Sequence, residues 1–247
     1  LNFTQPYYLA GFIVAALLHW QWSRRVTDPF IDPALFQNIP FRNGVVVGFT
    51  LFSVVLGTFF LIPLMLTSVH QLSTAQIGLL LFPGAISSVF FGPYAGGLAD
   101  RRGNTFVVSI GATLLVFSML LMAVFLGFSP LVVMVAMLAN YIGFTMFQTA
   151  MINCVSQTLP ESEAGIGMGI FNLISIVSGA LGTTLVGKIL DTGWLDFGLL
   201  SASSNPESYV YSDVLLVFGL ITVASALVFR GTFASPRKLA EISSEAV

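Results

Sequence analysis

The chain has 247 residues, of which 56% are hydrophobic and only 8% are charged. A soluble domain carries roughly 25% charged residues, so this composition argues against a water-soluble protein and indicates a chain whose solvent is the lipid bilayer. The net charge of −2 argues against nucleic acid as a partner, and the single cysteine, Cys154, excludes a disulfide within the chain.

Seven apolar runs are long enough to cross a bilayer as helices, which takes about 20 residues. Lipid offers no water to unpaired backbone groups, so helices are favoured, and no run shows the alternation of a membrane strand. The runs cover residues 5–22, 44–67, 77–98, 105–127, 131–153, 165–189 and 212–230. We therefore predict an all-α membrane protein with seven transmembrane helices.

Basic residues fall almost entirely on one side of this arrangement. Alternation of the seven helices places eight of the nine Lys and Arg residues together, and only Lys188 falls on the other side. Because basic residues are enriched in cytoplasmic loops, this distribution predicts a cytoplasmic C-terminus. The eight residues are Arg24, Arg25, Arg42, Arg101, Arg102, Arg230, Arg237 and Lys238.

The last six helices carry a weak internal repeat. The pattern Ala-x-Ile-Gly-x-x-x-Phe occurs at 75–82 and again at 164–171, each time where the middle helix of a triplet begins. The two middle helices run in opposite directions, as inverted repeats of a transporter half do. We expect two inverted three-helix repeats over 44–127 and 131–230.

This organisation divides the chain into three parts. Residues 1–43 form a linker transmembrane helix and a cytoplasmic surface segment, 44–230 a six-helix transporter half, and 231–247 a cytoplasmic tail. The outer connection over 191–211 is rich in Ser, Gly and Asn, and we expect it to be mobile. Since Leu1 already stands in apolar sequence, we expect a piece of a longer protein whose N-terminal transporter half is missing.

A charged cluster separates the apolar runs 77–98 and 105–127. Its glycines would let helices approach closely, and Asp100 could accept hydrogen bonds from a helix N-terminus. Its arginines could pair with acids or with anionic lipid. We expect a loop that serves as a conformational motif, and the alternative is a basic loop that only sets topology. The motif consists of Gly96, Gly97, Asp100, Arg101, Arg102 and Gly103.

Polar residues within apolar runs point to a transport pathway. Two helices each carry such residues on one face, at spacings of three or four residues. We expect the two faces to line a central cavity and to contact substrate, and hydrogen bonds between packed helices are the alternative for each residue. The first face consists of Asn140, Phe144 and Gln148, and the second of Asn172, Ser175 and Gly179.

No Asp or Glu lies at the centre of a predicted helix. Proton-coupled transport normally needs a titratable group within the membrane, so any coupling carboxylate should lie in the missing half. The sequence has no pattern typical of a metal site, a nucleophile or a phosphate-binding loop. We therefore expect no enzyme activity, no cofactor and no metal site.

Five stretches carry a family resemblance: Val26–Pro33, His70–Ala75, Phe82–Gly84, Asp100–Gly103 and Tyr209–Ser212. Together they resemble the fourteen-helix drug:proton antiporters of the major facilitator superfamily, and most of all the tetracycline-efflux proteins of Gram-positive bacteria. The resemblance covers nearly the whole chain, as the second linker helix and the C-terminal six-helix half. It implies a transporter of the bacterial cytoplasmic membrane.

The resemblance also implies a substrate and a coupling ion. Tetracycline-efflux members export a tetracycline–divalent metal complex in exchange for protons or monovalent cations. They carry a Glu where this chain has Gly179, so one candidate cation-coupling group is absent here. The alternatives are a multidrug or metabolite exporter with the same fold, and a transport-inactive membrane fragment.

Overall fold

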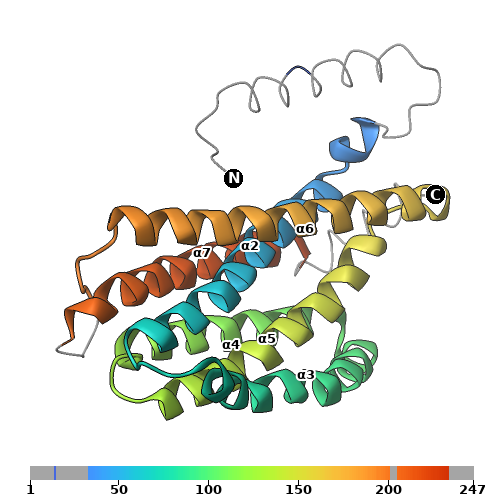
Figure 1. Cartoon of the computed structure of the whole chain (residues 1–247). Coiled ribbons are helices and arrows are strands. Elements are labelled where there is room, and N and C mark those ends of the chain that lie inside the picture. The colour runs from blue at the N-terminus through green and yellow to red at the C-terminus, as the bar shows by residue number, and fades with distance from the viewer. Residues whose placement is uncertain (1–13, 15–32, 201–204, 234–247) are drawn as a thin grey trace.

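The structure, a computed structural model, describes residues 14, 33–200 and 205–233. This part of the chain forms a bundle of long helices without any strand (Figure 1). Six helices are long and apolar enough to cross a membrane, which confirms the predicted all-α membrane architecture. The predicted helix over 5–22 lies outside the described residues. The elements are η1 (Pro33–Gln37), α2 (Ile39–Ser68), α3 (Thr74–Arg102), α4 (Asn104–Phe125), α5 (Pro130–Ser156), α6 (Glu161–Thr192), η2 (Pro206–Ser208) and α7 (Tyr209–Phe233).

The start of α2 differs most from the prediction, because the helix begins at Ile39 and not at residue 44. The side chain of Asn38 accepts a hydrogen bond from the Phe41 N–H (3.1 Å) and donates one to the carbonyl of Thr158 (2.7 Å). Leu35 and Phe41 are buried in the core. These two residues therefore pack against the bundle, and the cytoplasmic surface segment expected within 1–43 stays a prediction.

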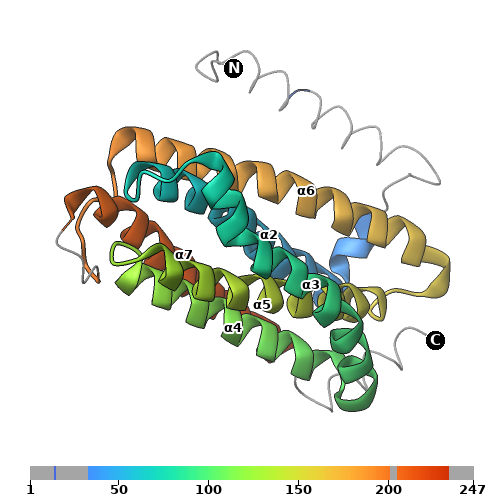
Figure 2. The same cartoon turned by 60° about the horizontal axis from the view of Figure 1, so that its bottom comes forward.

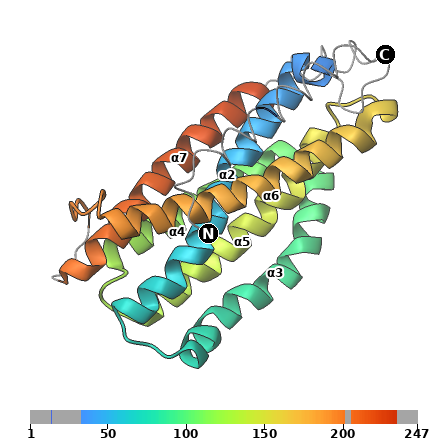
Figure 3. The same ribbon diagram turned by 45° about the horizontal axis from the view of Figure 1, so that its top comes forward.

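The helices are arranged in a back layer, a middle pair and two flanks. α4 packs against α7 in the back layer, while α2 and α5 lie over that layer. α6 flanks α2, and α3 flanks α5 to a similar extent. Figure 2 shows α6 on the side opposite α4, and Figure 3 shows α5 between α3 and α6. The α2–α5 pair is thus bordered on both sides by helices that have few other neighbours.

Glycines allow two of these helix pairs to pack with their backbones in contact. A Cβ on Gly111 of α4 would lie 2.7 Å from the carbonyl oxygen of Gly143 in α5, and a Cβ on Gly143 would lie 2.9 Å from that of Gly111. A Cβ on Gly182 of α6 would overlap the carbonyl of Ser53 in α2. Small residues at such crossings are typical of membrane helices, whose association depends on close packing.

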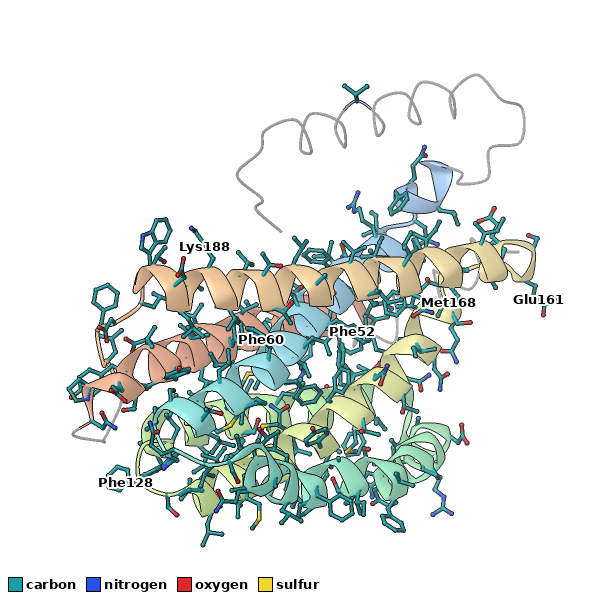
Figure 4. The ribbon with its side chains drawn as sticks, in the orientation of Figure 1. Phe52, Phe60, Phe128, Glu161, Met168 and Lys188 are labelled. Atoms are coloured by element: carbon teal, nitrogen blue, oxygen red, sulfur yellow. The ribbon has the colours of Figure 1, made fainter. Side chains whose placement is uncertain are left out.

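The two ends of the bundle carry different basic residues. The described arginines gather where α2 begins and where α3 and α7 end, which we call the arginine end, whereas Lys188 lies at the opposite, lysine end. A hydrogen bond from Thr105 Oγ1 to the Phe233 carbonyl (3.3 Å) joins two helix termini at the arginine end. Figure 4 shows Glu161 and Lys188 at opposite ends of α6. The arginine end carries Arg42, Arg101, Arg102 and Arg230.

Candidate functional site

An aromatic cluster lies where α2, α5 and α6 meet. Phe52 of α2 contacts Phe144 and Phe147 of α5 and Phe171 of α6, with ring centroids 5.6, 6.3 and 6.4 Å apart and the rings edge to face. Such pairs contribute about 0.5–1.5 kcal/mol beyond their buried area. Figure 4 labels Phe52 at this junction. The cluster therefore fixes the three helices around one aromatic centre.

The aromatic cluster continues along α2 toward the lysine end. Phe59 contacts Phe144 (5.9 Å between centroids) and stacks on Tyr141 (4.7 Å, with 23° between the ring planes). These three rings are only partly buried, whereas Phe52 is 7% exposed. An aromatic surface that is partly open thus lies between α2 and α5. Sequence reasoning found only Phe144 in it, although the seven-residue spacing of Phe52 and Phe59 on α2 was a signal for the others.

The three residues of the first predicted cavity face have different surroundings in the structure. Asn140 is fully buried and its Nδ2 donates a hydrogen bond to Ser118 Oγ in α4 (2.9 Å), while its Oδ1 has no partner among the described residues. This hydrogen bond is the helix–helix contact that the alternative interpretation expects. Phe144 belongs to the aromatic cluster, and Gln148 is partly buried one turn further along α5.

The three residues of the second predicted face also differ in their surroundings. Asn172 is exposed on α6, whereas Ser175 is buried and its hydroxyl donates to the carbonyl of Phe171 in its own helix (2.7 Å). Gly179 is buried, and a Cβ there would overlap the side chain of Leu56 in α2. Gly179 therefore lies in the contact between α6 and α2, where a larger side chain has no room unless Leu56 moves.

The charged segment that we expected to be a loop forms the last turn of α3. Asp100, Arg101 and Arg102 belong to α3, and only Gly103, with φ of 87°, separates it from α4. The loop prediction is wrong because the helix continues beyond the end of the apolar run, and arginines in a last turn interact favourably with the helix dipole. The guanidinium of Arg102 lies over the ring of Phe106, 5.4 Å from its centroid.

Neither predicted contact of this motif is made within the described part of the chain. Asp100 is exposed and accepts no hydrogen bond from these residues, and apart from the adjoining turns of α3 none of their atoms lies within 4 Å of a Cβ built on Gly96 or Gly97. α3 as a whole is sparsely covered, because only 17% of its most apolar stretch is buried, compared with 61% for α2. α3 therefore presents a wide apolar face that the described helices leave uncovered.

A buried carboxylate that sequence reasoning missed lies at the lysine end. Asp213, near the start of α7, is 2% exposed and accepts hydrogen bonds from the backbone N–H groups of Phe197 (2.7 Å), Gly198 (2.8 Å) and Leu199 (3.0 Å). These bonds anchor part of the connection that we expected to be mobile. No group of three or more His, Cys, Asp or Glu that could hold a metal ion occurs within the described ranges.

The described helices are those of a multi-pass membrane protein. Polar side chains such as Asn140 bond neighbouring helices, and the partly open surface is aromatic. Residues 2–183 match the family model of the Major Facilitator Superfamily, so the chain belongs to this superfamily of membrane transporters. Its members are transporters and generally not enzymes.

Several bacterial relatives have been named for what they transport or resist. The chain is 28% identical over 226 residues to the lincomycin resistance protein LmrB of Listeria monocytogenes, which covers 89% of this chain and 48% of that protein. It is 23% identical over 207 residues to the colistin resistance protein EmrB of Acinetobacter baumannii (82% and 40%). It is 26% identical over 155 residues to the riboflavin transporter RibZ of Clostridioides difficile (62% and 34%). The chain spans about half the length, or less, of these relatives.

Proposed function

We propose that this chain is the C-terminal part of a secondary active efflux transporter that works by alternating access. The observation that carries this proposal is the uncovered apolar face of α3 beside the α2–α5 pair. A second six-helix half docked on α3 and α6 would cover that face and would close a cavity over the aromatic surface. The relatives, which are about twice as long as this chain, are consistent with such a half.

The packing pattern supports two inverted repeats, α2–α4 and α5–α7. In this relation α2 corresponds to α5, α3 to α6 and α4 to α7. The α2–α6 contact then corresponds to the α5–α3 contact, and the α4–α7 contact corresponds to itself. Residues 1–43 would then supply the linker helix, and 231–247 the tail. The positive-inside rule makes the arginine end, and with it the C-terminus, cytoplasmic.

The substrate would bind on the aromatic surface between the two halves. Phe59, Tyr141 and Phe144 offer an aromatic, apolar surface, and Gln148 and Asn172 offer the few polar groups that orient a ligand in such a site. Drugs that combine rings with polar groups, such as tetracyclines, have this chemistry. The described helices carry no carboxylate at their centres, so protons or monovalent cations would be coupled through the missing half.

A metabolite exporter is the second candidate, because one relative is named a riboflavin transporter. Efflux of tetracycline, lincomycin, riboflavin and a lipophilic cation by the complete transporter, in cells without their own exporters, would separate the candidates. Export of tetracycline alone would support the tetracycline-efflux proposal. Export of riboflavin alone would support a metabolite exporter, and export of several compounds would support a multidrug transporter. We expect no flux from residues 1–247 by themselves, because half of the cavity wall is missing.

The cavity assignment is tested with two substitutions and a neighbouring control. Gln148→Ala and Asn172→Ala should each lower efflux several-fold at unchanged expression, because each removes a polar group that orients the ligand. Leu173→Ala is the control, since Leu173 is next to Asn172 and is exposed on α6. Normal efflux by both polar variants would contradict the assignment.

A further inference from the structure

An open cavity of about 720 Å³ lies at the arginine end, where α3 ends beside α4 and α7. Its lining includes the polar residues Arg102, Arg230, Thr105 and Ser109. Phe106 of α4 also lines the cavity, and the guanidinium of Arg102 lies over its ring. The cavity thus combines two cationic residues, which form what we call its rim, with an otherwise mostly apolar lining.

The two guanidinium groups have no anionic partner in the described part of the chain. No carboxylate of these residues lies within 4 Å of Arg102 or Arg230, and both arginines are exposed. α4 begins at Asn104 beside the same rim, where α3 and α7 end, so the helix dipoles oppose one another there and the positive charge comes from the arginines. Two exposed guanidinium groups without a carboxylate partner favour a bound anion.

An apolar groove leads from this rim along the bundle. A second cavity of about 210 Å³ shares Ser109 and Arg230 with the first and continues between α4 and α7. Ala112 and Val116 line it on the α4 side, and Val223 lines it on the α7 side. The two helices form the back layer, on the side of the bundle away from α6 (Figure 2). Val47 and Leu51 of α2 complete the apolar lining of the groove.

We propose that the two cavities together bind one anionic phospholipid. Its phosphate lies between Arg102 and Arg230, and one acyl chain lies in the groove between α4 and α7. A phosphate pairs with both guanidinium groups by charge-assisted hydrogen bonds. The apolar groove would add binding energy for an acyl chain but none for free inorganic phosphate. The site lies on the back layer, so it is separate from the proposed substrate surface between α2 and α5.

The headgroup contact is tested by lipid retention on the complete transporter in neutral detergent, measured by native mass spectrometry during titration with palmitoyl-oleoyl-phosphatidylglycerol. The double variant Arg102→Gln/Arg230→Gln should bind this lipid about thirtyfold more weakly, and retention of phosphatidylcholine should not change. Arg42→Gln is the control, because Arg42 is exposed at the same end but does not line the cavity. Unchanged retention by the double variant, or an equal loss in Arg42→Gln, overturns the proposal.

The acyl-chain contact is tested with a variant that fills the groove. Ala226→Leu should weaken binding of the long-chain lipid and leave dihexanoyl-phosphatidylglycerol unaffected, because Ala226 lines the groove. Ala224→Leu is the matched control, since Ala224 is exposed on the same helix outside the groove. Displacement of the lipid by millimolar inorganic phosphate would show a simple anion site and would overturn the proposal. No readout here involves transport, so failure here leaves the proposed function standing.

Discussion

The ring of Tyr141 in α5 stacks on the ring of Phe59 in α2, with centroids 4.7 Å apart and the ring planes 23° from parallel. The same tyrosine ring abuts α3, because a Cβ on Gly84 would lie 2.5 Å from Tyr141 Cδ2. One side chain therefore joins the middle pair of helices to the sparsely covered flank. A movement of α3 against α2 would therefore act directly on Tyr141.

Replacement of Gly84 by alanine should destabilise the bundle. The added methyl would press on a ring that Phe59 already holds in place, and such overpacking costs about 1–3 kcal/mol. We expect Gly84→Ala to lower the Tm of the purified complete transporter, measured by thermal unfolding in detergent. Gly78→Ala in the same helix is the control: no described atom lies within 4 Å of its Cβ, and alanine is the better helix former by up to about 1 kcal/mol. A Tm for Gly84→Ala that equals or exceeds that of Gly78→Ala would contradict the close contact.

Asn140 and Ser118 should respond differently to replacement, although they share a hydrogen bond. Ser118→Ala leaves both polar atoms of a fully buried Asn140 unpaired, which should cost about 1 kcal/mol. Asn140→Leu removes both the unpaired Oδ1 and the Nδ2 donor and keeps the branching of the side chain, although leucine is bulkier. We therefore expect a smaller loss of stability than in Ser118→Ala. A larger loss in Asn140→Leu than in Ser118→Ala, measured by Tm, would mean that Oδ1 has a partner such as substrate or water.

The helices could be predicted from the sequence because lipid imposes one requirement on every spanning segment. A run of about 20 apolar residues marks a helix regardless of what it packs against. The helix ends escaped this criterion. Asn38 begins α2 through a side-chain hydrogen bond, and Asp100–Arg102 extend α3 into polar sequence. Charged and amide side chains end an apolar run without ending the helix.

Much of the candidate site could not be found in the sequence for a different reason. The chain has 23 phenylalanines, so nothing in the sequence except their spacing distinguishes Phe52 and Phe59 from the others. Their role follows from the helices that they meet, which only the fold decides. Asp213 stands at the start of an apolar run, where an exposed acid is expected, and its burial depends on a connection that folds back over it.

Asp213→Asn should loosen the connection at the lysine end. An asparagine offers one acceptor oxygen where the carboxylate offers two, and its NH2 group opposes a backbone N–H. Loss of charge-assisted hydrogen bonds worth about 1.5–3 kcal/mol should raise the hydrogen-exchange rates of Phe197–Leu199 by tenfold or more, measured by mass spectrometry. The control is Asp196→Asn, because Asp196 is exposed in the same connection. Equal protection in both variants would show that the anchor lies elsewhere.

Asp100→Asn tests whether the end of α3 is a conformational latch. Asp100 is exposed and has no partner among the described residues, so its removal should leave the Tm of the complete transporter unchanged. If the carboxylate pairs with the other half in one state of the cycle, turnover at saturating drug should fall about tenfold, equivalent to about 1.4 kcal/mol of activation free energy. Glu161→Gln, an exposed acid at the same end, should transport normally. Normal turnover in Asp100→Asn would instead favour the interpretation that the charges of this turn only set topology, since a topological role depends on Arg101 and Arg102 and not on the acid.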